Sequence, residues 1–133
     1  MLIADLGISF PYRSNRPMVT ISIQNEKGEW TKIDFVVDTG ANVSAISYNT
    51  AKRIGLNTTI YTGIQLISGV IGSNTLLHMK DVTAQLNGVS LRLKLGISNK
   101  ISDDINILSY KSILPKFLLA FTTDETALFL SER

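Results

Sequence analysis

Apolar and polar side chains alternate along much of this chain, and this period of two is typical of strands that bury one face. The alternation is clear over Met18–Ile23, where branched apolar residues alternate with polar ones. Asn25–Gly28 has the composition of a turn, and Trp30–Val37 reads as the returning strand. These residues predict a first β-hairpin.

A second hairpin is predicted in the later half of the chain. Apolar residues occupy every other position over Val82–Leu86 and again over Val89–Leu95. The two runs flank Asn87 and Gly88, and Asn-Gly is a strong hairpin signal because both residues tolerate positive φ.

Helix signals are few and short. Ser47–Ile54 has room for about two turns and is followed by Gly55, a residue that commonly ends helices. A second short helix is predicted within Lys111–Leu119, started or interrupted by Pro115. Thr126–Leu130 is predicted to be a terminal strand.

The length favours one domain over residues 1–133, and the many short strands with glycine-bearing turns favour an all-β fold, closed as a sandwich or barrel with one or two short helices. The 133 residues are 44% apolar and 18% charged, an ordinary globular composition. No apolar run approaches the roughly 18 residues of a membrane span, so no membrane partner is expected. The first residues lack the features of a secretory signal, and a cytoplasmic protein is the default expectation.

Residue usage excludes several kinds of chemistry. The chain has no cysteine and one histidine, His78, so thiolate sites, a cysteine nucleophile and a multi-histidine metal cluster are excluded. No metal or organic cofactor is expected, and His78 itself is assigned a structural or surface role. The formal charge is +2 and the basic residues are scattered, so no nucleic-acid partner is predicted. A pI near 9.0 is the one feature that leaves a nucleic-acid-associated barrel as a minor alternative.

The stretch FVVDTGANVSAIS ends an apolar strand on an acid, Asp38, followed by Thr39 and Gly40. Burying a carboxylate without a partner costs several kcal/mol or more. The Asp38 carboxylate is therefore either buried for a chemical role or exposed to water. One interpretation is an aspartate that ends a strand and caps a turn, with Gly40 supplying the conformational freedom. The other is a reacting carboxylate.

The same stretch resembles the aspartic protease signature, apolar-apolar-Asp-Thr-Gly-Ala. Arg16–Ile23 is also similar to the strand that precedes the catalytic hairpin in the retropepsins, the retroviral-type enzymes. The resemblance implies a closed retropepsin-like acid-protease barrel with Asp38 as catalytic aspartate. It also implies that the Thr39 hydroxyl braces two catalytic loops across a dimer and that the Gly40 backbone approaches the carboxylate.

This chemistry needs two carboxylates that share one proton, because both cannot ionise a few Å apart. One acts as base toward a water while the other donates to the scissile carbonyl of a peptide. The motif occurs once, since the acids at Asp103, Asp104, Asp124 and Glu125 lack the Thr/Ser-Gly continuation. If Asp38 is catalytic, a C2 homodimer with the site on its axis is therefore expected.

Ile67–Ser73 lies about thirty residues after Asp38 and contains glycines that bracket two apolar residues. In retropepsins a Gly-Ile-Gly tip at this place is the flap that closes over the peptide, although an ordinary glycine turn has the same composition. With the flap, the predicted substrate-binding residues are Ala41, Asn42, Gly69, Val70, Ile71, Gly72 and Ile107.

Three positions depart from the family pattern. Ser109 stands where glycine is usual, Tyr110 where retroviral members carry arginine, and Asn42 where they tend to carry an acid. The two charged partners are absent together, so no buried charge is stranded. A side chain at Ser109 is expected to crowd the catalytic loop and lower activity. That expectation keeps an alternative open, a dimeric peptide-binding or scaffold module with little or no catalysis.

The resemblance covers residues 16–114 and leaves both ends of the chain outside it. In the family both termini interleave into a sheet between subunits, and Ala127–Leu130 fits that role. An edge strand within the monomer is the alternative for the same residues.

Overall fold

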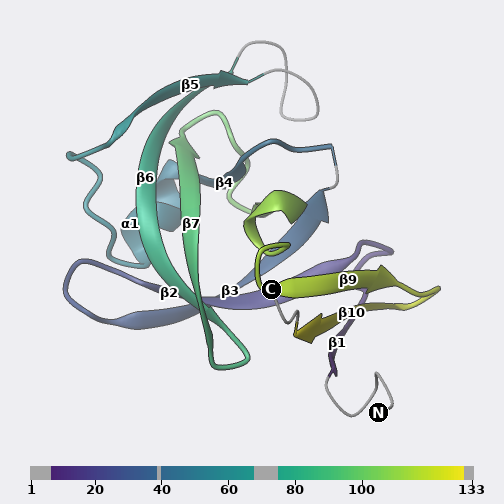
Figure 1. Ribbon diagram of the computed structural model, residues 1–133. Helices are drawn as coiled ribbons and strands as arrows, with labels where there is room; N and C mark the ends of the chain where they lie inside the picture. Colours follow the sequence, from purple (N-terminus) through teal and green to yellow (C-terminus); the bar gives the residue numbers. More distant parts are fainter. Residues whose placement is uncertain (1–6, 39, 68–74, 131–133) are drawn as a thin grey trace.

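The computed structural model describes residues 7–38, 40–67 and 75–130, most of which form β-strands (Figure 1). Along the chain the elements are β1 (Gly7–Pro11), β2 (Met18–Gln24), β3 (Trp30–Asp38), β4 (Ser44–Ser47), α1 (Tyr48–Arg53), β5 (Gly63–Ile67), β6 (Thr75–Leu86), β7 (Val89–Ser98), β8 (Ile107–Ser109), the 3-10 turn η2 (Tyr110–Ser112), β9 (Phe117–Phe121) and β10 (Glu125–Leu130).

The larger sheet closes on itself and confirms the predicted barrel. Its strand order is β2-β3-β8-β4-β7-β6-β5, and an additional pairing of β2 with β6 closes a ring of six strands. β5 pairs with β6 outside that ring, as Figure 1 shows. The pairings β3–β8 and β4–β7 are parallel, so β8 and β4 bring separate parts of the chain beside the end of β3.

The barrel interior is apolar and follows the alternation read from the sequence. In β2 every second side chain is buried, with Val19, Ile21 and Ile23 at 1% exposure or less. β3 contributes Phe35 and β7 contributes Leu93, both fully buried in the same cluster. Burying such a side chain contributes about 1.5–3 kcal/mol relative to leaving it exposed, which fixes the register of each strand. The first predicted hairpin is confirmed.

The second predicted hairpin is also confirmed, as β6 and β7. Asn87 and Gly88 take φ values of 50° and 79°, as a two-residue turn of this type requires, and Leu86 pairs with Val89 across it. β6 continues back to Thr75, well beyond the predicted Val82–Leu86.

The helix predicted at Ser47–Ile54 is present as α1. The Ser47 hydroxyl caps it by accepting a hydrogen bond from the Thr50 backbone N–H. The helix ends before Gly55, whose φ is +84°. Any Cβ at Gly55 would lie 2.6 Å from Nδ2 of Asn25, so both backbone conformation and space require glycine there.

The helix predicted within Lys111–Leu119 is wrong. η2 ends at Ser112, a further turn follows in which the Phe117 N–H donates to the Ile113 carbonyl, and the chain then enters β9. Pro115 lacks the N–H that a helix interior needs. The buried side chains of Ile113 and Phe117 are held by the barrel core, and β9 pairs with β10. Tertiary packing therefore decides this segment.

β1, β10 and β9 form a separate three-stranded sheet in that order (Figure 1). The terminal strand predicted at Thr126–Leu130 is confirmed as β10. Ala127 pairs with Ser9 on one side and with Ala120 on the other. β10 is thus a central strand of a sheet within its own chain, neither an edge strand nor a strand that needs a second subunit for its partners.

No helix in the described ranges combines the length and hydropathy needed to cross a membrane.

A buried lysine joins the first hairpin to the middle of the chain. Lys80 on β6 is 8% exposed, and its Nζ lies 3.0 Å from Oε1 of Glu26. The same Nζ donates to the Ile60 carbonyl at 3.0 Å. Oε2 of Glu26 accepts from the Asn57 N–H at 2.8 Å. A single carboxylate therefore compensates the lysine and fixes the loop that precedes β5.

This pair predicts a pH-dependent contribution to stability. Burial acts to raise the pKa of the Glu26 carboxyl, but hydrogen bonds from the Asn57 backbone and Lys80 outweigh it and lower the pKa below its ordinary value. The contribution is present above the unfolded-state pKa and is lost as pH falls through the folded-state pKa. Urea unfolding of wild type and Glu26→Gln should differ at about pH 7 and converge at about pH 3. An unchanged difference between the two pH values would contradict the assignment.

Candidate active site

Asp38 is the last residue of β3 and lies beside β8. In the parallel pairing with β8, Val37 is opposite Leu108 and Asp38 is opposite Ser109. The Val37 N–H donates to the Pro17 carbonyl at 2.9 Å, so the strand is held on both sides up to the acid. The buried Val37 fixes the strand end in the core, and the half-buried Asp38 follows directly at the end of the barrel wall.

The chain turns sharply after Asp38. The Gly40 N–H donates to Oδ1 of Asp38 at 2.8 Å, and the Ala41 N–H donates to the Asp38 carbonyl at 3.3 Å. Gly40 is exposed, and a Cβ there would lie 3.4 Å from Oδ1. An aspartate that merely caps a turn makes the same bond, so this geometry fits both interpretations of the acid. A carboxylate held by a backbone amide is also a carboxylate in a fixed orientation.

The predicted flap tip, Gly69, Val70, Ile71 and Gly72, lies outside the described residues, as does Thr39. The strands on either side of the tip, β5 and β6, are among the described residues. β5 and β6 pair antiparallel up to Ile67 opposite Thr75, so a strand lies on each side of the predicted tip. Ile67 and Leu77 pack in one cluster with Val43 and Ala45, which lie just after the turn at Asp38. The hairpin is thereby anchored over the residues that follow Asp38.

The three remaining predicted substrate contacts differ in exposure. Asn42 is exposed and Ala41 is half-buried, and both follow Gly40 on the loop to β4. Ile107 is 5% exposed and pairs with Val36 on one side and Ala45 on the other. Ile107 is therefore part of the wall beneath the loop, while Asn42 is open to a ligand.

Ser109 does not crowd this loop in the way the sequence predicted. Its side chain is buried at 1% exposure, and its Oγ donates to the Ala41 carbonyl at 2.8 Å. Its backbone N–H donates to Oγ of Ser44 at 3.0 Å. Ser44 Oγ in turn lies 3.0 Å from Oγ of Ser112, with either atom able to donate. The extra side chain is thus a hydrogen-bonding link between the loop and its neighbours.

Comparison with known proteins identifies the family. A family model described as "gag-polyprotein putative aspartyl protease" matches residues 21–108, well over half of the chain. The chain belongs to this aspartyl protease family. The matched residues run from β2 to β8 and include Asp38 and its loop. A comparison with curated proteins found no match.

Solved structures of aspartic proteases share the fold of this family member. The EIAV protease complexed with the inhibitor HBY-793 has a TM-score of 0.61 and 22% identity, covering 77% of this chain and 88% of that one. A retropepsin-like aspartic protease from Rickettsia conorii has a TM-score of 0.63 and 22% identity, covering 92% of this chain and 98% of that one. The barrel is therefore retropepsin-like.

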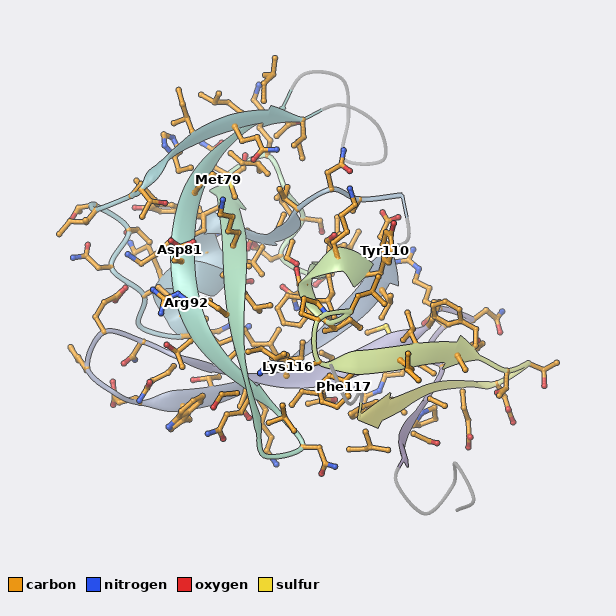
Figure 2. All side chains as sticks on the ribbon, viewed as in Figure 1. Met79, Asp81, Arg92, Tyr110, Lys116 and Phe117 are labelled. Atoms are coloured by element: carbon orange, nitrogen blue, oxygen red, sulfur yellow. The ribbon has the colours of Figure 1, made fainter. Side chains whose placement is uncertain are left out.

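The aspartyl protease chain carries a cation beside its loop that the sequence reading missed. Nζ of Lys111 donates to Oδ1 of Asn42 at 3.0 Å. Tyr110 packs partly buried against the core, and Figure 2 shows it beside the C-terminal end of β3. The loop is thus contacted by a cation one residue after the position where retroviral members carry arginine. A lysine directly after Tyr110 was the signal available in the sequence.

His78 lies apart from this site on the outer side of β6. Its ring stacks on Tyr61 with centroids 4.8 Å apart and a tilt of 30°. Both rings line a cavity of about 540 Å³ that also contacts Tyr48, Leu76 and Lys100. Of the described residues at the candidate site, Asp38, Gly40, Ala41 and Asn42 do not line this cavity. Across the described ranges no group of three His, Asp or Glu side chains is arranged to hold a metal ion.

Proposed function

We propose that this protein is an aspartic endopeptidase in which Asp38 and Asp38 of a second subunit activate the attacking water. The observation that carries the proposal is the position of Asp38, at the end of a buried strand with Oδ1 fixed by the Gly40 N–H at 2.8 Å. The chain's membership of an aspartyl protease family supports it.

The proposed reaction needs no group beyond the two carboxylates. One carboxylate takes a proton from water as the water attacks the scissile carbonyl, and the other, protonated, donates to the carbonyl oxygen. As the C–N bond breaks, the carboxyl group that took the proton from water donates it to the leaving amine, and the other carboxylate recovers a proton from a hydroxyl of the tetrahedral intermediate. No covalent intermediate forms. The pair titrates as a unit, so its two macroscopic pKa values belong to the dyad.

A second subunit is proposed because the motif occurs once. The other acids near the site have different partners. Asp34 on β3 pairs with Arg13 and accepts from Thr20, while Asp103 accepts from Asn49 near the start of α1. A C2 axis through the two Asp38 loops would bring the carboxylates together, because an isologous contact places equivalent residues across the axis.

The substrate is proposed to be a peptide or protein segment bound in extended form between the loop and the β5–β6 hairpin. Such a segment pairs through backbone hydrogen bonds and is read through alternating side-chain pockets. The binding-module alternative drew its support from crowding by Ser109. Because that hydroxyl makes a hydrogen bond at 2.8 Å with the Ala41 carbonyl, Ser109 gives the alternative no support.

The test is cleavage of a mixed library of unstructured peptides from about pH 3 to about pH 7, with sedimentation run on the same samples. Acidic to neutral pH is chosen because a shared proton is required. Cuts at defined bonds by a dimeric protein support the proposal and give its specificity. A sedimenting dimer that binds peptides and leaves them all intact overturns it.

A further inference from the structure

We propose that Ser109 is a positioning residue for the catalytic loop. Its hydroxyl holds the loop by a hydrogen bond that glycine, the usual residue at this position, cannot make. The inference rests on the proposed protease function. The loop between β3 and β4 must hold Asp38 in one orientation, yet only one hydrogen bond from the loop, from the Gly40 N–H, reaches the carboxylate within the described part of the chain. The support comes from β8 and η2.

The first support is the hydrogen bond from Ser109 to the loop. Ser109 lies opposite Asp38 in the β3–β8 pairing, and its Oγ donates to the Ala41 carbonyl at 2.8 Å. Ala41 directly follows Gly40, whose N–H holds Oδ1 of Asp38. A displacement of the backbone at Ala41 would therefore also displace the neighbouring Gly40 N–H, which orients the Asp38 carboxylate.

The second support fixes Ser109 itself. Its backbone N–H donates to Oγ of Ser44, which is fully buried. Ser44 Oγ can still donate to Ser112 Oγ, 3.0 Å away on η2. Ser109 is thus held through its backbone N–H by Ser44 and Ser112, while its own hydroxyl holds the loop at Ala41. The bond between the Ser109 N–H and Ser44 Oγ is buried, and its loss would leave a polar group without a partner in the core, so it keeps Ser109 in place.

The third support is Lys111, whose backbone contacts the Ser109 hydroxyl and whose side chain contacts the loop. Ser109 Oγ accepts from the Lys111 N–H at 3.3 Å and caps η2, while Nζ of Lys111 donates to Oδ1 of Asn42 at 3.0 Å. Ala41 and Asn42 are therefore both held from the same short segment. We call Ser109, Lys111 and their two loop partners the loop clamp.

The loop clamp accounts for two of the three departures from the retroviral pattern, Ser109 and Asn42. Serine in place of glycine supplies a donor, and asparagine in place of an acid accepts from Lys111 without a charge pair. Tyr110 replaces the arginine and packs on the core instead. Returning position 109 to glycine restores the family residue but removes the only side-chain donor to the Ala41 carbonyl among the described residues.

The test compares Ser109→Gly and Ser109→Ala with wild type on a peptide that wild type cleaves. Misplacing a catalytic group by a fraction of an ångström lowers the rate more than it lowers binding, so kcat should fall by roughly 10- to 100-fold. KM should change by less than about threefold. Ser109→Thr keeps the hydroxyl and should retain most of the activity. A kcat for Ser109→Gly at or above the wild-type value overturns the inference.

Ser47→Ala is the matched control. Ser47 is buried to the same degree and its hydroxyl is also hydrogen-bonded, but it caps α1 by accepting from Thr50. This variant should lose stability and keep the wild-type kcat. Equal losses of kcat in Ser47→Ala and Ser109→Ala would assign Ser109 a general structural role and overturn the inference.

Amide hydrogen exchange at Gly40 tests the clamp without cleavage. In labelled protein the Gly40 amide should exchange at least about tenfold faster in Ser109→Gly than in wild type, and should be unchanged in Ser47→Ala. Unchanged exchange in Ser109→Gly overturns the clamp whatever the activity. If the Gly40 amide exchanges faster in Ser109→Gly but the wild-type protein cleaves no peptide, the clamp stands and the proposed function is overturned. The two failures are therefore distinguishable.

Discussion

Replacing Asp38 by asparagine is expected to reduce peptide cleavage by about a thousandfold or more, with the fold retained. The amide is nearly isosteric with the carboxylate, and its oxygen can still accept from the Gly40 N–H. In the proposed homodimer both subunits carry the substitution, so neither amide can take a proton from water or donate one as a carboxylic acid, and the reaction loses both its base and its acid. Cleavage of a fluorogenic peptide by wild type and variant measures the loss, with urea unfolding recording stability.

Asp34→Asn is the matched control for this substitution. Asp34 lies on the same strand, four residues earlier, and its carboxylate is paired with the exposed Arg13. Exposed ion pairs contribute about 0–1 kcal/mol, so this variant should fold and cleave as wild type does. Full activity in Asp38→Asn would remove Asp38 from the mechanism. Equal losses in both variants would mean that the assay reports folding rather than chemistry.

Gly96→Ala is expected to destabilise the fold by about 1–3 kcal/mol, although it adds a single methyl group. Gly96 on β7 pairs with Met79 on one side and Ala45 on the other. A Cβ at this position would lie 2.5 Å from Cδ1 and 3.0 Å from Cβ of Leu77, which is fully buried. Leu77 cannot move into solvent, so β6 and β7 must separate. Urea unfolding measures the cost.

Two further variants test the steric cause. Gly63→Ala is the matched control, because a Cβ at Gly63 meets nothing within 4 Å and its stability should change by less than about 0.5 kcal/mol. In the double variant Gly96→Ala with Leu77→Ala, the cost should be smaller than the sum of the single costs, because the shortened side chain relieves the contact. Additive costs would contradict the proposed clash.

The loop clamp shows which features of the site the sequence could predict and which it could not. Position 109 was recognised in the sequence as unusual, and its predicted effect was unfavourable. The sequence placed a hydroxyl near the loop but could not show that a carbonyl lies 2.8 Å away, because Ser109 and Ala41 are 68 residues apart along the chain. The same limit hid the contact between Lys111 and Asn42.

Local segments were predicted well because their determinants are local. The alternation of Met18–Ile23, the Asn-Gly turn and the Ser47 cap each depend on residues a few positions apart. The helix expected within Lys111–Leu119 failed because its short-range propensity was overridden by Ile113 and Phe117 entering the barrel core.

The sequence by itself determined the strand pattern, both hairpins, the position of α1 and the acid at the end of an apolar strand. It did so because side-chain period, turn chemistry and capping act over a few residues. Only the tertiary structure decided that the barrel closes through β2 and β6, that β10 lies between β1 and β9, and that Ser109 holds Ala41. These features join residues far apart in the chain, and such contacts form only when the barrel core brings their strands together.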